Sequence, residues 1–303
     1  MRRSSKELGL LGCVFFIPTK RMKEVLFLMP KYKKGEKNPE CQSHMGQHLL
    51  HNKSIIKKIV SSANIKPHEL VVEIGPGSGA LTLPLSEKAN YVLAIEKDAT
   101  FVRELRRKMK GINNLKVIHG DFLHFRLPKQ SYVVVANIPF GITTPILRKL
   151  LNQPANPMDR AVLVIEKGAA KRFTTSRPTN PEVLKWRMWF RFTMGQQIGS
   201  YCFSPPPSVE SVVFKIKRRQ ELLIPFKYHK DFMGFAAYAL RFPQLPIRYA
   251  LKGIFTAPQI TRLLRDLKVE PFVPIYSLTE KEWAKAFMTM VEYVPDYRWP
   301  KRK

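Results

Sequence analysis

Short apolar runs alternate with amphipathic stretches between residues 52 and 218. The runs predict buried strands at residues 70–74, 91–95, 116–119, 132–136, 161–165 and 211–216. Between them apolar residues recur at helical spacing, first from Asn52 to Val60 and most clearly over 99–109. Continuous apolar strands separated by helices are typical of a mostly parallel sheet that is covered on both faces. The pattern therefore predicts an α/β fold of the Rossmann-like kind.

The pattern changes after the basic triplet Lys217-Arg218-Arg219. Helical spacing then continues with no apolar strands between the helices, which we expect at residues 232–240, 249–255, 258–267 and 279–291. We therefore expect a sheet-containing domain at residues 43–218 and a small all-helical C-terminal domain at residues 219–303. Residues 1–42 are expected to be a flexible basic N-terminal extension, because the arm from Lys31 to Lys37 is basic and lacks apolar periodicity.

The start of the chain contains one apolar run, Gly9 to Pro18, that loosely resembles a signal peptide. Basic residues from Lys20 to Lys23 follow it without a small-residue cleavage site, and the run is too short to span a bilayer. We expect a disordered or mis-assigned leader, with Met22 and Met29 as alternative starts, and no membrane association.

Charge and cysteine content narrow the function. The chain carries 52 Lys and Arg against 23 Asp and Glu, a net charge of +29. A surplus this large favours a polyanionic partner, with nucleic acid ahead of an anionic membrane. Cys13, Cys41 and Cys202 are too few and too far apart for a disulfide framework or a zinc site, which fits a cytoplasmic protein.

The first predicted strand runs into a glycine-rich turn, Glu73-Ile74-Gly75-Pro76-Gly77-Ser78-Gly79-Ala80. Glycines at a strand-to-helix turn let the backbone approach a ligand. Gly75, Gly77 and Ala80 fit the dinucleotide fingerprint, and Glu96 ends the next strand where a ribose-binding acid would lie. Glu73 and Gly79 instead favour S-adenosylmethionine, whose methyltransferases carry an acid and three glycines at this turn.

The next two strands also end in polar residues with aromatic neighbours. The third ends at Asp121-Phe122, where an acid can accept from an adenine amino group. The fourth ends at Asn137-Ile138-Pro139-Phe140, where a carboxamide could grip an exocyclic amine and an aromatic ring could stack on a base. Ligands of open parallel sheets lie across the carboxyl ends of the strands, so these residues should converge on one crevice.

The motifs together resemble those of ribosomal RNA adenine N6-methyltransferases. The matching segments are Gln47-His48-Leu49-Leu50, Glu73 to Gly79, Glu96, Asp121-Phe122, Asn137 to Phe140 and Phe203 to Ser211. Segments 46–52, 166–173 and 186–189 look most like the Erm branch, whose members methylate one adenine of 23S rRNA and confer resistance to macrolides, lincosamides and streptogramin B. The resemblance covers residues 42–295 and implies a Rossmann-like methyltransferase that uses S-adenosylmethionine. Residues 43–218 would be its cofactor-binding catalytic domain, and residues 219–303 would be a small helical RNA-binding domain.

The resemblance also implies the roles of individual residues. The cofactor would contact Gln47, His48, Leu50, Gly75, Gly77, Glu96, Asp121, Phe122 and Asn137, with Glu96 on the ribose and Asp121 on the adenine. The catalytic segment would be Asn137, Ile138, Pro139 and Phe140. His48 stands where many relatives have Asn, and Phe140 replaces a commoner Tyr. Stacking needs the ring face, so we expect Phe140 to function without the hydroxyl.

The chemistry implied needs no catalytic base. Two acceptors on the amine hydrogens, Asn137 Oδ1 and a backbone carbonyl, would draw the nitrogen toward tetrahedral geometry and direct its lone pair at the methyl donor. The base must leave its stack to reach the pocket, and Phe140 would offset part of that cost.

Basic residues are expected to bind the RNA, and the protein is expected to act as a monomer on naked 23S rRNA or early ribosome precursors. The candidates are the arm at Lys31 to Lys37, Arg103 to Lys108, Lys167, Lys171, Arg172 and Lys215 to Arg219. Trp186 and Trp189 are expected to pack in the core. Two alternatives stay open: a KsgA-type small-subunit rRNA dimethyltransferase, and a non-catalytic RNA- or DNA-binding relative.

Overall fold

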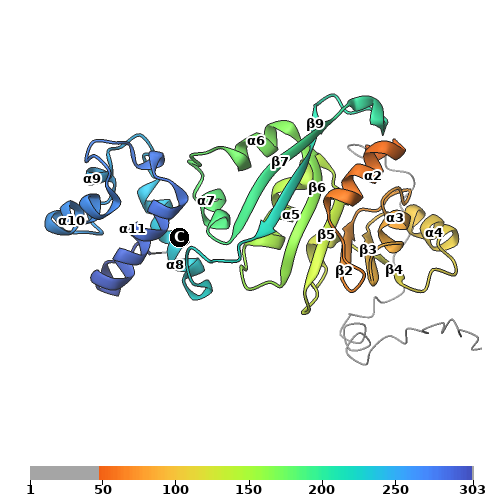
Figure 1. Ribbon diagram of the computed structural model, residues 1–303, viewed down its shortest axis with the longest axis horizontal. Coiled ribbons are helices and arrows are strands. Elements are labelled where there is room, and N and C mark those ends of the chain that lie inside the picture. The colour runs from red at the N-terminus through yellow and green to blue at the C-terminus, as the bar shows by residue number, and fades with distance from the viewer. Residues whose placement is uncertain (1–47, 302–303) are drawn as a thin grey trace, which may run out of the picture. The chain divides into compact units, whose positions relative to one another are not determined.

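The computed structural model describes residues 48–301 (Figure 1). The N-terminal extension predicted for residues 1–42 lies outside these residues, as does Gln47. Within the described part of the chain no helix is long and apolar enough to cross a bilayer.

A seven-stranded sheet forms the centre of the fold, in the order β4-β3-β2-β5-β6-β9-β7. The strands are β2 (Leu70–Ile74), β3 (Tyr91–Glu96), β4 (Leu115–His119), β5 (Tyr132–Asn137), β6 (Met158–Glu166), β7 (Phe190–Ile198) and β9 (Ser211–Arg218). The first five pair in parallel, whereas β9 runs antiparallel to both β6 and β7. The prediction of a mostly parallel sheet is confirmed, and all six predicted strands are present.

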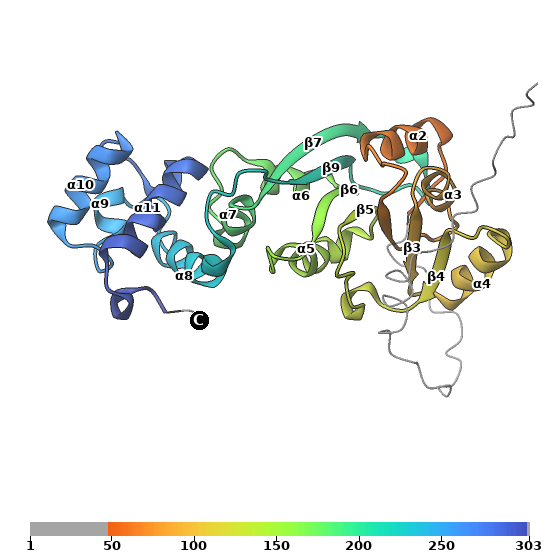
Figure 2. The same cartoon turned by 60° about the horizontal axis from the view of Figure 1, so that its bottom comes forward.

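Both faces of the sheet are covered, because side chains of successive strand residues point to opposite sides. Val71, Val133 and Val135 pack in a core with α2 (Lys53–Ser62) and α3 (Thr82–Ser86). Val72 and Val134 pack in the opposite core with α5 (Thr143–Leu151), α6 (Lys167–Thr174) and α7 (Pro181–Arg187). Figure 2 shows α2 and α5 on opposite sides of the strands.

Side-chain caps fix where the first helices begin. The Asn52 side chain accepts from Ile55 N at 3.1 Å at the start of α2. Asp98 does the same for α4 (Ala99–Lys108), accepting from Thr100 N at 2.6 Å. Each cap satisfies a backbone N–H that the helix leaves unpaired, so the polar residue after each extended segment starts the helix there.

Helices follow β9 in the described chain: α8 (His229–Ala239), α9 (Ile247–Ala250), α10 (Ala257–Leu267) and α11 (Glu280–Tyr293). One large core continues from the sheet into them, and the buried Trp186 and Trp189 lie in it, as predicted. The predicted helix at residues 249–255 is wrong in extent. Gly253 has φ +103°, and a Cβ there would lie 2.5 Å from the Tyr238 hydroxyl, so the chain turns at this residue.

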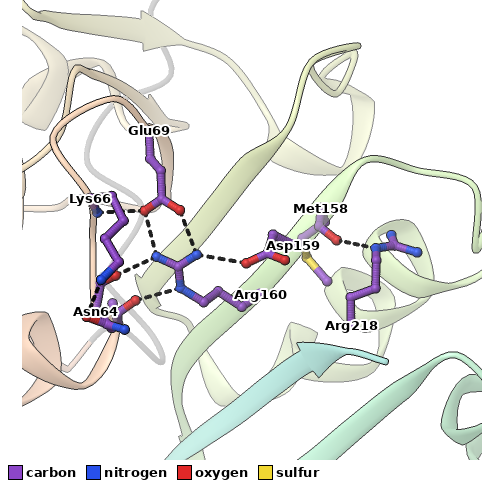
Figure 3. Close-up of polar contacts among 8 residues, drawn as sticks. Asn64, Lys66, Glu69, Met158, Asp159, Arg160 and Arg218 are labelled. Atoms are coloured by element: carbon purple, nitrogen blue, oxygen red, sulfur yellow. Dashed lines mark hydrogen bonds and ion pairs between the residues drawn. The ribbon is translucent and has the colours of Figure 1, made fainter. Parts of the chain in front are cut away.

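Two arginines of the sheet are used to hold the fold together (Figure 3). Arg160 on β6 makes a two-pronged ion pair with Glu69, at 2.8 Å and 2.6 Å, and donates to the Ala63 carbonyl at 2.7 Å. Burial acts to raise the pKa of Glu69, but the hydrogen bonds from Arg160 and from Lys66 N more than offset it, so this pKa lies below its usual value. Arg218 donates to the Met158 carbonyl at 2.9 Å. These contacts tie β6 to the α2–β2 connection and β9 to the start of β6.

Candidate active site

One pocket opens at the carboxyl ends of β2, β3 and β5, where the crevice was expected. It holds about 1010 Å³ of space, counted out to its open mouth. Every predicted site residue that the structure describes lines it: His48, Leu50, Gly75, Gly77, Glu96, Asp121, Phe122, Asn137, Ile138, Pro139 and Phe140. The structure therefore brings these predicted residues together around one pocket, and their individual roles stay predictions.

The glycine-rich turn leaves room for a ligand on its backbone. Gly75 has φ +62°, and the place of a Cβ on it has no atom within 4 Å. Gly77 has φ +52°, and a Cβ there would lie 2.8 Å from Leu49 Cδ2. Side chains would be strained at both positions, and one at Gly75 would also fill the open space of the pocket.

Glu96 at the end of β3 is bound to this turn. One of its carboxylate oxygens accepts from Gly77 N at 3.0 Å, and the other accepts from Asp98 N at 2.8 Å. The residue is only 3 % exposed. A carboxylate oxygen can accept more than one hydrogen bond, so Glu96 is held in place and can still accept from hydroxyls in the pocket.

Asp121 follows β4 and is held by two donors. Its Oδ1 accepts from Leu123 N at 2.8 Å and its Oδ2 accepts from Lys97 Nζ at 3.1 Å. Burial acts to raise the pKa of Asp121, but these hydrogen bonds outweigh it and the pKa lies below its usual value. The carboxylate is therefore kept ionised as an acceptor. Sequence reasoning missed Lys97, although it comes directly after Glu96 at the end of a strand.

The segment from Asn137 to Phe140 is oriented by His48. Asn137 Nδ2 donates to the His48 carbonyl at 2.8 Å, which fixes the amide plane and leaves Oδ1 as its other polar atom. The His48 ring lies 5.8 Å from the Phe140 ring, between centroids. The turn itself is closed by Ile142 N on the Pro139 carbonyl and by the buried Thr143 hydroxyl on the Phe140 carbonyl.

His48 is held in turn by a segment far away in the sequence. β1 (Leu49–Leu50) pairs antiparallel with β8 (Phe203–Ser204), and His48 Nδ1 lies 2.8 Å from the Pro205 carbonyl. The proline-rich motif that starts at Phe203 was noticed in the sequence, but its position beside the site could not be read from it. No local pattern marks two-residue strands.

Glu73 is the unusual titratable group of the site. It is 1 % exposed, and its Oε2 has no hydrogen-bond partner in the described residues. Burial raises its pKa to about 8; the neighbouring Thr82 hydroxyl acts to lower this pKa, and the charge of Glu96 adds a smaller increase. The neutral acid is therefore the main form at pH 7. Sequence reasoning used Glu73 only as part of a motif.

Lys149 on α5 supports the Phe122 side of the pocket and was not predicted. Its Nζ donates to the Leu123 carbonyl at 3.0 Å and lies 5.8 Å from the centre of the Phe122 ring. Burial lowers the pKa of this ammonium group. The sequence could not place Lys149 near the site, because its partner lies in the η1 turn (Phe122–His124), and the position of this turn beside α5 is known only from the structure.

The pocket fits S-adenosylmethionine. The open space beside Gly75 leaves room for a ligand against the backbone. Glu96 offers a fixed carboxylate for ribose hydroxyls, and Asp121 offers a carboxylate for an amino group. The neighbouring Asn137 and Phe140 supply an acceptor and a ring face for a second planar group. The donor set is thus suited to a nucleoside cofactor and a target base side by side.

Comparisons with known proteins agree with this chemistry. The family model of ribosomal RNA adenine dimethylases matches residues 39–292. An rRNA adenine N-6-methyltransferase of Bacillus licheniformis is 45% identical over 262 residues, covering 86% of this chain and 91% of that protein. A ribosomal RNA small subunit methyltransferase A of Dehalococcoides mccartyi is 30% identical, covering 81% of this chain and 87% of that protein.

A solved structure shares the fold. The crystal structure of the 23S rRNA methyltransferase ErmE matches with a TM-score of 0.71 at 24% identity, over 80% of this chain and 99% of that one. At this identity the match speaks for the fold, whereas the family rests on the motif set and the sequence relatives. The chain belongs to the ribosomal RNA adenine N6-methyltransferases and is an S-adenosylmethionine-dependent enzyme.

Proposed function

We propose that this enzyme methylates N6 of one adenine in 23S rRNA and thereby confers resistance to macrolide, lincosamide and streptogramin B antibiotics. The observation that carries the proposal is the orientation of Asn137. Its Nδ2 is committed to the His48 carbonyl, so its Oδ1 is the atom left to accept from a target amine beside Phe140.

The cofactor half of the pocket would hold S-adenosylmethionine through the chain's own acceptors. Glu96 would bind the ribose hydroxyls, Asp121 the adenine amino group, and the segment from His48 to Leu50 the methionine part, beside the cradle at Gly75. When bound, the cofactor supplies a methyl group on a positively charged sulfur, which is an activated electrophile. The protein then has only to position and polarise the nucleophile.

The target half of the pocket would act on the adenine amine. Asn137 Oδ1 and the Ile138 carbonyl would each accept one amine hydrogen and so turn the nitrogen lone pair out of the base plane. Pro139 shapes this turn, because it adds no N–H that would compete for the carbonyls. Phe140 would stack on the base, a contact worth about 1–3 kcal/mol against an unstacking cost of a few kcal/mol.

An open groove beside the catalytic turn would receive the RNA. Thr144, Arg148, Arg172, Thr175 and Asn180 are among its lining residues. Thr144 is four residues from Phe140, so a nucleotide next to the target adenine could lie here. Arg148 forms an ion pair with Glu182, whose carboxylate accepts from the Arg148 Nε at 3.0 Å. Arg172, one of the predicted RNA-binding residues, is exposed.

Some of the predicted RNA-binding cations are engaged within the protein. Arg218 donates to backbone carbonyls, and Arg219 pairs with Glu280 and donates to the Arg187 carbonyl at 2.9 Å. Lys167 lies 2.7 Å from Glu210. We therefore leave these three out of the proposed RNA surface, because moving them to a phosphate would break existing bonds.

The choice of 23S rRNA over the small-subunit RNA is supported by the Erm-like segments at residues 46–52, 166–173 and 186–189. The relatives agree with this choice in that the more similar one is not named as a small-subunit enzyme. The 45% identity to an rRNA adenine N-6-methyltransferase exceeds the 30% identity to a small-subunit enzyme. The small-subunit dimethyltransferase is the second candidate, because its relatives match most of the chain. Activity as a monomer, a cytoplasmic location, and a division into domains at residues 43–218 and 219–303 belong to the same proposal.

One experiment separates the candidates. The full chain and its Asn137→Ala variant are expressed in a bacterium that is susceptible to macrolides, and N6-methyladenine is mapped on both large rRNAs by reverse transcription and mass spectrometry. The proposal expects resistance and one modified adenine in 23S rRNA, both lost in the variant. Modification of 16S rRNA alone would support the small-subunit function, and no modification of either RNA would refute the proposed function.

A further inference from the structure

Glu73 is a buried carboxyl group in the wall of the pocket. It is 1 % exposed, and its Oε2 has no hydrogen-bond partner among residues 48–301. The neighbouring Thr82 hydroxyl on α3 acts to lower the pKa of this acid, but it does not donate to Oε2 in this geometry. Buried polar atoms are nearly always satisfied, so an unpartnered carboxyl oxygen in a pocket wall indicates that a ligand supplies the missing interaction.

The charged side chains around Glu73 do not supply a counter-ion. The other titratable groups that line the pocket are His48, Glu96, Lys97 and Asp121. Glu96 is a second acid, and its charge acts to raise the pKa of Glu73. Lys97 is paired with Asp121 at 3.1 Å, and the His48 ring is held on a backbone carbonyl at 2.8 Å. A positive charge for Glu73 therefore has to come from a bound molecule.

The sheet register places Glu73 on the same face as Asn137. Glu73 on β2 pairs with Val135 on β5. Glu73 comes two residues after Val71, and Asn137 comes two residues after Val135; both valines pack in the core with α2. Side chains two residues apart on a strand point to the same face of a sheet. Glu73 and Asn137 therefore project from one face, on neighbouring strands.

Glu96 projects from this face as well, on the other side of Glu73. β2 lies between β3 and β5 in the sheet (Figure 1). Glu96 comes four residues after Val92, which packs in the core with α2, and Glu73 pairs with Ala94 of β3. Glu96 and Asn137 each lie two residues nearer the carboxyl edge than the partner of Glu73 on that strand. Glu73 therefore forms the floor between the acid expected at the ribose and the amide expected at the target amine.

The charge of the methyl donor belongs above this floor. In S-adenosylmethionine the methyl group is carried by a sulfonium that is bonded to the side-chain carbon of the ribose. A ribose at Glu96 and an amine at Asn137 therefore put the positive sulfur over the end of β2. The inference rests on the proposed function in this one respect, that the target amine lies at Asn137.

We propose that Glu73 is the counter-ion of the sulfonium, and that it gives up its proton to the solvent when the methyl donor binds. Without a ligand the buried acid is neutral; a positive charge beside it favours the carboxylate, so the O–H bond breaks and the proton passes to the buffer. Methyl transfer leaves an uncharged thioether, and Glu73 then takes a proton back. Glu73 thus favours the methyl donor over the demethylated product, S-adenosylhomocysteine.

The number of protons released on binding tests the proposal. It is obtained from calorimetric titrations of the full chain at about pH 6.5, in buffers of different ionisation enthalpy. Because the pKa of Glu73 is about 8, nearly all of it is protonated at this pH before binding. We expect S-adenosylmethionine to release about one proton and S-adenosylhomocysteine much less. The α-amino groups of both ligands titrate near pH 7.7–8.0, so they contribute little to the difference.

Two variants identify the group that titrates. Glu73→Gln keeps the shape of the side chain and should release no proton with either ligand. Its affinity for S-adenosylmethionine should fall about tenfold or more, with little change for S-adenosylhomocysteine. Between about pH 6 and pH 7 the wild-type affinity for the methyl donor should rise by up to about tenfold per pH unit, and that of Glu73→Gln should stay level. Glu87→Gln is the control, because it removes an exposed carboxylate at the end of α3, outside the pocket lining, and should behave as wild type.

Three results would overturn the inference. They are binding of S-adenosylmethionine to the wild type without proton release, equal release by the two ligands, and unchanged release in Glu73→Gln. The first two use the wild type alone, so they decide the matter even if the variant does not fold. The proton count needs no RNA, whereas the proposed function is tested by mapping methylated rRNA, so the two can fail separately.

Discussion

Replacing Glu73 by Gln should stabilise the protein increasingly as the pH rises. Glu73 is 1 % exposed with an unpartnered Oε2, and burial with the nearby Glu96 raises its pKa to about 8 from a usual 4.5. Because the pKa is higher in the folded state, the contribution of the neutral acid is complete below 4.5. It is lost progressively as the pH rises toward 8, since the unfolded chain ionises first.

The size of the effect comes from the two pKa values. Between pH 5 and pH 8 the folded wild type binds up to about one proton more than the unfolded chain, so its free energy of unfolding falls by up to about 1.4 kcal/mol per pH unit relative to the variant. Over this interval the difference reaches about 4 kcal/mol. Gln is uncharged at every pH and nearly isosteric, so any cost of placing its amide is a constant offset that leaves the slope unchanged.

Urea unfolding of the cofactor-free wild type and Glu73→Gln at several pH values from 5 to 9 measures this difference. The two curves should diverge up to about pH 8 and then run parallel. Val72→Ala, a buried truncation next to Glu73 on β2, serves as the control and should cost the same at every pH. A difference between Glu73→Gln and wild type that does not depend on pH would show that Glu73 ionises normally in the fold, and the assignment of a neutral acid would be wrong.

The remaining predictions concern the reaction. Asn137→Ala should lower the methylation rate by about 10²–10³-fold, as for loss of a preorganised polar contact to the reacting group, while calorimetry finds cofactor affinity within a few-fold of wild type; normal turnover would refute its role. Phe140→Leu should lower kcat/KM for RNA about 5- to 100-fold through lost stacking, whereas Phe140→Tyr keeps the ring face and should retain kcat/KM. An equal loss in both variants would show that the stacking face of the ring is not what the reaction needs. Lys97→Met should move the acidic limb of cofactor binding to higher pH, because the Lys97 ammonium helps to keep the pKa of Asp121 below its usual value; an unshifted limb would mean that Asp121 does not control binding.

The sequence predicted the central sheet and most of the pocket because these depend on continuous apolar runs and on the residues at the carboxyl end of each run. It missed β7, whose exposed positions interrupt the apolar pattern and whose pairing with β9 is irregular between Met194 and Gln197. An edge strand of this kind has no continuous buried face to reveal it. The roles of Arg218 and Arg219 were also hidden, because a basic run looks the same whether its side chains reach solvent or backbone carbonyls.

The pairing of β1 with β8 brings three separate sequence motifs together in space. The hydrogen bond from Asn137 Nδ2 to the His48 carbonyl fixes the direction in which Oδ1 points. The position of His48 depends on the pairing of Leu49 and Leu50 with Phe203 and Ser204 and on the Pro205 carbonyl. The Asn137 amide, the segment from His48 to Leu50 and the proline-rich segment are therefore connected by one series of hydrogen bonds. A change at Pro205 should act on the reaction through Asn137, although residue 205 is not itself among the pocket's lining residues.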